Sequence, residues 1–69
     1  MEVSNFLNIG LQKGDGLLLK YDTGEIMHGN YRGEYDSSRL TFSFYNSVKD
    51  KIETISIKKL DNLDITSRV

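Results

Sequence analysis

Hydrophobic and polar residues alternate along most of this chain, as they do in strands with one buried face. The clearest case is 40–45, where Leu40, Phe42 and Phe44 occupy every second position. The same alternation predicts strands at 16–22, 25–35 and 52–58, and we expect a last strand at 64–68. Strands that follow one another in hairpins form an antiparallel sheet.

Glycines and polar residues separate or interrupt these strands. We predict turns at 22–25 and 36–39 and a polar loop at 46–51. Gly29 and Gly33 stand inside the second strand, where glycine usually marks a bulge, a sharp bend or a close backbone approach. A strand that bends at both glycines, most tightly at Gly29, allows so short a chain to form a small barrel.

Two short helical segments complete the prediction. A helix within residues 3–12 would be capped by Ser4 or Asn5 and limited by Gly10 and Gly14, and 59–63 would form one helical turn before the last strand. The predicted fold is mostly β, a small five-stranded, strongly bent antiparallel barrel in a single domain (1–69, core 16–68). We expect five inward side chains, those of Leu19, Phe42, Phe44, Ile55 and Ile57.

The amino-acid composition limits the kinds of catalytic and metal sites that the chain could form. The chain has 69 residues, no cysteine and a single histidine, and it contains no catalytic, metal or cofactor motif. General acid–base catalysis by His28 would need an oriented partner, and the spacing identifies none. We therefore expect a binding protein, not an enzyme. A domain this small without disulfides or metal often gains stability by oligomerising.

The net charge and the hydropathy of the chain limit the kinds of partner that it is expected to bind. Nine basic residues against ten acidic ones give a net charge of −1, which argues against broad, salt-driven binding to nucleic acid. The longest apolar run, 17–19, is too short to span a bilayer, and the N-terminus lacks the features of a secretory signal. We expect a cytoplasmic protein with no membrane contact.

Several residues stand in the order of two known motifs. The pattern of the first is matched without a gap by Gly24, Gly29, Tyr31, Gly33, Leu40 and Phe42. The second, a strand followed by a basic residue, often Gly-Asp-Asn, and an aliphatic residue, is similar to residues 57–63, with Leu60 in the place of glycine. Over roughly residues 16–66 the chain thus resembles the Sm-like family, which includes the Sm and LSm proteins and bacterial Hfq. The resemblance implies a ring of small barrels that binds RNA at loops around a central hole.

The resemblance also implies a ligand site. Tyr35 takes the place of the family's loop Asp and Arg39 that of its Asn, while the Lys-His pair of Hfq is absent. In such a loop Tyr35 would stack on a base and Arg39 would meet phosphate. The predicted ligand-binding residues are Tyr35, Asp36, Arg39, Lys59 and Asn62.

Structural roles for the same residues stay open at this point. Residues 36–39 also make a good turn, and a basic group of Lys58 and Lys59, with Arg68 nearby in sequence, would also protect strand ends from edge aggregation.

Three functions compete. The first is an Sm-like ring that binds RNA or a nucleotide without catalysis, its subunits joined through 52–58 and 63–68. Pairing these strands between subunits would remove two exposed sheet edges. The main alternative is an SH3-like protein-interaction or regulatory domain that binds no nucleic acid, which the nearly neutral charge favours. A third, held at lower weight, is an oligomer of a mobile-element type that sequesters a nucleotide between subunits.

Overall fold

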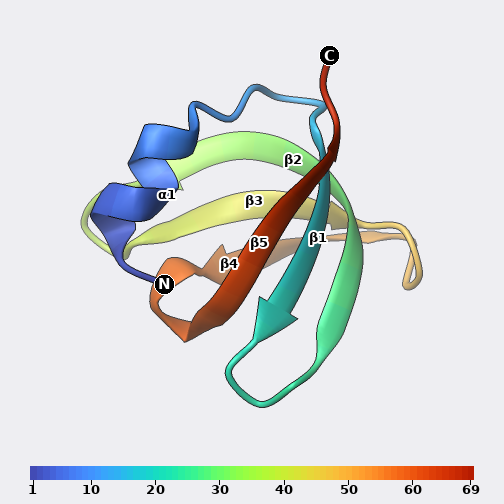
Figure 1. The fold of residues 1–69 in the computed structure, drawn as a ribbon. Coiled ribbons are helices and arrows are strands. Elements are labelled where there is room, and N and C mark those ends of the chain that lie inside the picture. Colours follow the sequence, from blue (N-terminus) through green and yellow to red (C-terminus); the bar gives the residue numbers. More distant parts are fainter.

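The structure, a computed structural model that describes residues 1–69, confirms a mostly β fold. Its elements are α1 (Val3–Ile9), β1 (Gly16–Tyr21), β2 (Ile26–Asp36), β3 (Thr41–Asn46), β4 (Lys51–Ser56), the 3₁₀ helix η1 (Ile57–Lys59) and β5 (Leu60–Ser67). The strands form one antiparallel sheet in the order β4-β3-β2-β1-β5. Figure 1 shows this sheet strongly curved around the core. It is not closed into a barrel, because the edge strands β4 and β5 do not pair.

The core follows the alternation of the sequence. The five side chains predicted to point inward are each no more than 1% exposed, which confirms the strand register. They join residues from every strand, and Phe6 of α1, in one apolar cluster. Phe6 is the only fully buried residue of α1, and its ring stacks on that of Phe42 with centroids 5.0 Å apart. Phe6 therefore anchors the helix in the core, and Val3 and Ile9 pack partly buried against the same cluster.

The irregular part of β2 lies later than predicted. Pairing runs without interruption through Gly29, opposite Leu17 on one side and Asn46 on the other. The register shifts instead on both sides of Gly33, where Gly33 (φ 82°) and Glu34 (φ 56°) both have left-handed backbone. The prediction of the tightest bend at Gly29 therefore receives no support from the pairing, whereas Gly33 does mark a bulge.

Several predicted details were wrong. The helix lies within 3–12 and ends at Gly10, as predicted, but it begins after Glu2 and has no side-chain cap from Ser4 or Asn5. The fourth strand spans Lys51–Ser56 and not 52–58. The helix that does form is neither long nor apolar enough to cross a membrane.

The helical turn predicted at 59–63 and the start of the last strand at 64 were also wrong. η1 lies earlier, at Ile57–Lys59, and β5 begins directly at Leu60. Leu60 and Leu63 are three residues apart, a spacing that a helical turn would place on one face. Both are buried on a strand because Leu60 pairs with Tyr21 and Asn62 with Lys20, which leaves Asp61 as an extra residue in a bulge.

Candidate nucleic-acid interface

The turn between β2 and β3 is tied to η1 at one end of the sheet. The backbone N–H of Ile57 donates a hydrogen bond of 3.0 Å to the carbonyl of Leu40. The N–H of Leu40 donates in turn to the carbonyl of Asp36, at 2.7 Å. Leu40 has φ 56°, a conformation that a bulky residue rarely adopts, and these two bonds hold it. The two segments that carry Arg39 and Lys59 therefore lie next to each other.

Asp36 shapes the turn itself. One of its carboxylate oxygens accepts hydrogen bonds from the Ser38 hydroxyl (2.6 Å) and from the backbone N–H groups of Ser38 (2.9 Å) and Arg39 (3.1 Å). The Ser38 hydroxyl and these N–H groups hold the pKa of the Asp36 carboxyl below its usual value. The side chain of Arg39 is left exposed.

Tyr35 has a structural partner that the sequence did not reveal. Its ring lies 6.0 Å, centroid to centroid, from that of Phe6, and it packs half-buried against the edge of the core. Tyr35 therefore helps to support α1.

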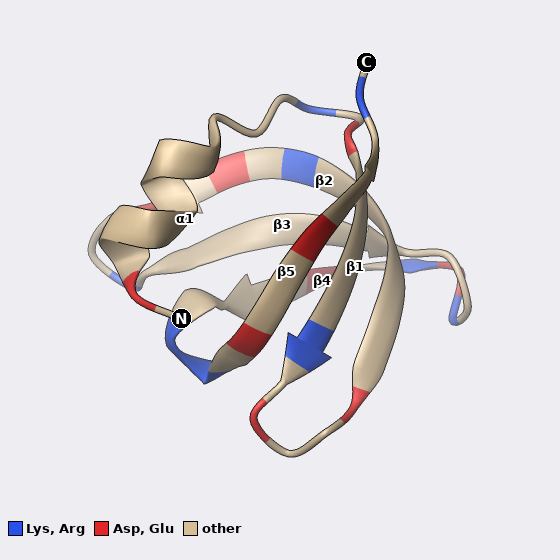
Figure 2. Ribbon diagram, viewed as in Figure 1, with Lys and Arg blue, Asp and Glu red and all other residues tan.

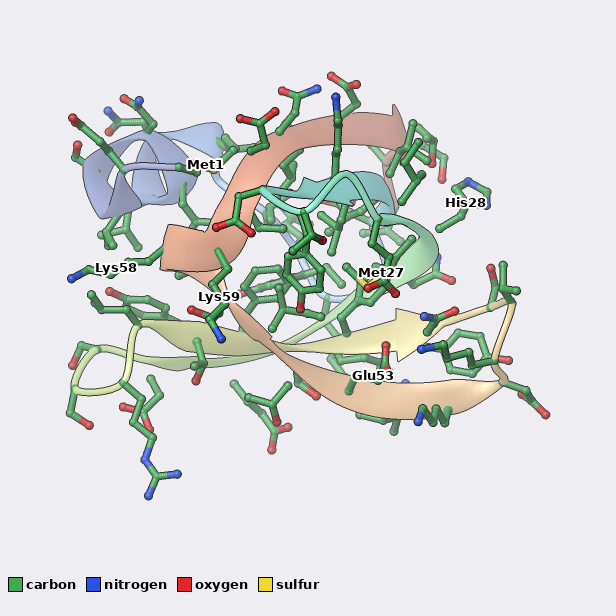
Figure 3. All side chains as sticks on the ribbon, turned by 90° about the horizontal axis from the view of Figure 1, so that it is seen from below. Met1, Met27, His28, Glu53, Lys58 and Lys59 are labelled. Atoms are coloured by element: carbon green, nitrogen blue, oxygen red, sulfur yellow. The ribbon has the colours of Figure 1, made fainter.

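Lys58 and Lys59 are both exposed on η1. The carbonyl of Lys59 accepts a 2.8 Å hydrogen bond from the N–H of Asp22, which connects η1 to the turn between β1 and β2. Figure 3 shows that the Lys58 side chain extends away from the fold and that Lys59 points in a different direction. The helix η1 thus presents two ammonium groups to solvent.

Asn62 does not join this group through any hydrogen bond. It lies on β5, opposite Lys20 of β1, and its amide donates to the carboxylate of Asp64 at 3.1 Å. Four of the five predicted ligand residues lie on two segments that a hydrogen bond joins: Tyr35, Asp36 and Arg39 at the β2–β3 turn, and Lys59 on η1. The fifth, Asn62, lies on β5 and outside these segments.

The cations that lack ion pairs are concentrated at this end. Of the nine lysines and arginines, four pair with carboxylates: Lys20, Lys49, Lys51 and Arg68. Of the other five, Arg39, Lys58 and Lys59 belong to the β2–β3 turn and η1, whereas Lys13 and Arg32 lie elsewhere. Figure 2 shows the basic residues of η1 followed by acidic positions along β5. This end therefore offers three cations with no ion-pair partner.

Arg68 does not belong to the basic group suggested by the sequence. Its guanidinium lies 3.5 Å from the carboxylate of Asp15 and donates to the carbonyls of Ile9 and Gly10 at the end of α1. Asp15 is fully buried and also accepts from the N–H groups of Gln12 and Val69. These N–H groups, first that of Gln12, and the charge of Arg68 lower the pKa of Asp15. Asp15 and Arg68 thus fasten the helix to the end of β5.

A second polar cluster occupies the opposite end of β4, and sequence analysis missed it. Glu53 accepts a 3.0 Å hydrogen bond from the Asn46 amide and lies 3.6 Å from the ammonium of Lys51. The Asn46 amide lowers the pKa of Glu53. Figure 3 shows Glu53 pointing from β4 into the fold, towards Met27. Glu53 lies two residues before Ile55 and four before Ile57, so the alternation that points these two side chains inward also predicts an inward position for the Glu53 carboxylate.

These groups form an open surface. No pocket opens in the molecule, and no group of three or more His, Asp or Glu side chains is placed to hold a metal ion. Comparison with protein-family models, with curated proteins and with solved structures found no match.

Proposed function

We propose that this chain is a non-catalytic, Sm-like binding module that self-associates through its sheet edges and binds RNA or nucleotides. The observation that carries the proposal is the Leu40–Ile57 hydrogen bond, which joins the turn that carries Arg39 to the helix η1 that carries Lys58 and Lys59. Unpaired cations on adjacent loops attract phosphate groups, because each contact releases counterions from the nucleic acid. We place this function in the cytoplasm, as the sequence predicts.

The two free edges support self-association. β4 (Lys51–Ser56) and β5 (Leu60–Ser67) are the two outer strands of the sheet, and each pairs with one neighbour only. Pairing of β4 with β5 of a second copy would cover both kinds of free edge, whereas pairing of β4 with β4 would leave β5 uncovered. Such head-to-tail contacts produce a ring when the rotation closes. A ring would repeat the three cations around its axis, so that one ligand meets several copies.

Two measurements on the purified protein test this function. Light scattering gives the oligomeric state, and fluorescence anisotropy with short single-stranded RNA, with calorimetry for nucleotides, gives binding. We expect an oligomer that binds, and we expect Arg39→Ala to weaken binding with little loss of stability. The matched control is Arg32→Ala, an exposed arginine on β2 that also has no ion pair. A monodisperse monomer that binds neither RNA nor nucleotide would refute the proposal.

The alternative is an SH3-like domain with a protein partner. One observation favours it: Ile52 is 58% exposed on the free edge strand β4, where an extended segment of another protein can add a strand. Binding to proline-rich peptides has less support, because such peptides dock in aromatic-lined grooves and no aromatic side chain here is exposed. A monomer without affinity for nucleic acid would make this alternative the better one.

The third possibility, sequestration of a nucleotide between subunits, requires the same oligomer. Calorimetry distinguishes this possibility from RNA binding. If the protein sequesters nucleotides, a mononucleotide or cyclic nucleotide should bind more tightly than a single-stranded RNA.

A further inference from the structure

The aromatic side chains of this protein are all engaged within the fold. Four are buried, namely Phe6, Tyr31, Phe42 and Phe44. The three others are half-buried: Tyr35 packs against Phe6, Tyr21 lies against the core, and Tyr45 donates its hydroxyl proton to Asp50. Stacking on aromatic rings is the main way in which proteins hold unpaired bases. No aromatic side chain here is fully exposed, and Tyr35, the one in the predicted site, packs against Phe6.

The acidic and amide groups of the predicted site are partly engaged in contacts within the fold. Asp36 accepts from the Ser38 side chain and from two backbone N–H groups of its own turn. The amide of Asn62 donates to Asp64. Groups of this kind read the edges of bases, and these contacts leave fewer of their atoms free to do so. Arg39, Lys58 and Lys59 remain, with exposed cationic heads that make no ion pair.

Resting on the function proposed above, we infer that this site recognises phosphate groups and does not discriminate among bases. Its ligand class is a chain of phosphates, either the backbone of single-stranded nucleic acid or a polyphosphate. Three exposed cations on two joined segments give such a chain several possible contacts for its negative charges. The chain requires neither a pocket nor a stacking platform, which agrees with the open surface at this end.

Competition binding tests the inference. Fluorescently labelled oligoadenylate, oligouridylate and an abasic oligonucleotide of the same length would be titrated with the wild-type protein, and inorganic polyphosphate would be added as competitor. We expect the three affinities to agree within about threefold and polyphosphate to displace them all. For single strands, a plot of the logarithm of the binding constant against the logarithm of the salt concentration should have a slope of about −0.7 per phosphate contact.

Variants locate the site. Lys58→Ala and Lys59→Ala should each weaken binding of all three oligonucleotides alike and make the salt dependence shallower, whereas the control Lys13→Ala should not. An affinity for one base more than about tenfold higher, or failure of the abasic strand to bind, overturns the inference and leaves the proposed function standing. If no oligonucleotide binds at low salt, the inference fails, and the proposed function fails with it when nucleotides do not bind either. Equal losses in Lys13→Ala would show that general charge causes binding, which also overturns the inference.

Discussion

The backbone carbonyl of Tyr45 lies directly against the Cα of Gly29. A β-carbon at position 29 would clash with the Tyr45 carbonyl oxygen and lie 2.8 Å from its carbon. Both atoms belong to the backbone of paired strands, so neither can rotate away. We therefore expect Gly29→Val to destabilise the fold by about 3 kcal/mol, although valine is the better strand former.

Urea denaturation followed by circular dichroism measures this loss. His28→Val is the matched control, since it introduces the same side chain at an exposed neighbour on β2 and should change stability little. A Gly29→Val protein as stable as wild type would show that β2 and β3 do not approach as closely as the structure has them.

The aromatic stack under α1 leads to a second prediction. Phe42 is 1% exposed and lies between Phe6, at 5.0 Å, and Tyr31, at 5.5 Å. Phe42→Ala would leave a cavity in the core and remove the principal anchor of the helix. We expect a loss of about 3–5 kcal/mol in the free energy of unfolding. Val48→Ala, at a position 82% exposed, is the control, and equal melting temperatures for the two variants would contradict the assigned core.

The burial of Asp15 leads to a prediction about pH. Hydrogen bonds from Gln12 and Val69, with the charge of Arg68, lower the pKa of Asp15 from 3.8 in the folded state. The folded protein therefore binds this proton less readily than the unfolded chain does. The carboxylate stabilises the fold above pH 3.8, and this contribution is lost as the pH falls through the lower folded pKa.

Asp15→Asn measures that contribution. At pH 7 we expect the variant to be clearly less stable than wild type in urea, because the carboxylate charge and one acceptor oxygen are lost. The difference should narrow as the pH falls below 3.8. Asp64→Asn, on the exposed side of β5, should stay close to wild type at pH 7. A gap between wild type and Asp15→Asn that is constant with pH would show that the charge of Asp15 does not stabilise the fold.

Much of this fold could be predicted because alternation reports directly on burial. The register of Phe42, Phe44 and Ile55 followed from a period of two, and Gly10 ended the helix as its conformational freedom allows. At β-bulges, however, the alternation no longer predicts which side chains are buried. Leu60 and Leu63 share a face only because Asp61 is an extra residue, and no local signal in the sequence distinguishes that from a helical turn.

The candidate site was less accessible to sequence reasoning, since its geometry depends on long-range contacts. That Arg39 and Lys59 belong to joined segments follows from the Leu40–Ile57 bond, which no local pattern encodes. The same holds for Tyr35, whose partner Phe6 is far away in the chain, and for the ion pair of Arg68 with Asp15. The inward position of Glu53, in contrast, was already implied by the alternation along its strand.

The free edge of β4 gives the last prediction. Ile52 is 58% exposed on this strand, next to the backbone groups that a second copy would pair with. Ile52→Lys should therefore leave the folded subunit intact, as judged by circular dichroism, and shift the mass measured by light scattering towards the monomer. Ile55 is unsuitable for this test because it is 1% exposed, and a charge there would unfold the subunit. Val48→Lys adds the same charge in the neighbouring turn and should leave assembly unchanged. If Ile52→Lys associates as the wild type does, β4 is not the contact, and assembly through paired edges must be abandoned.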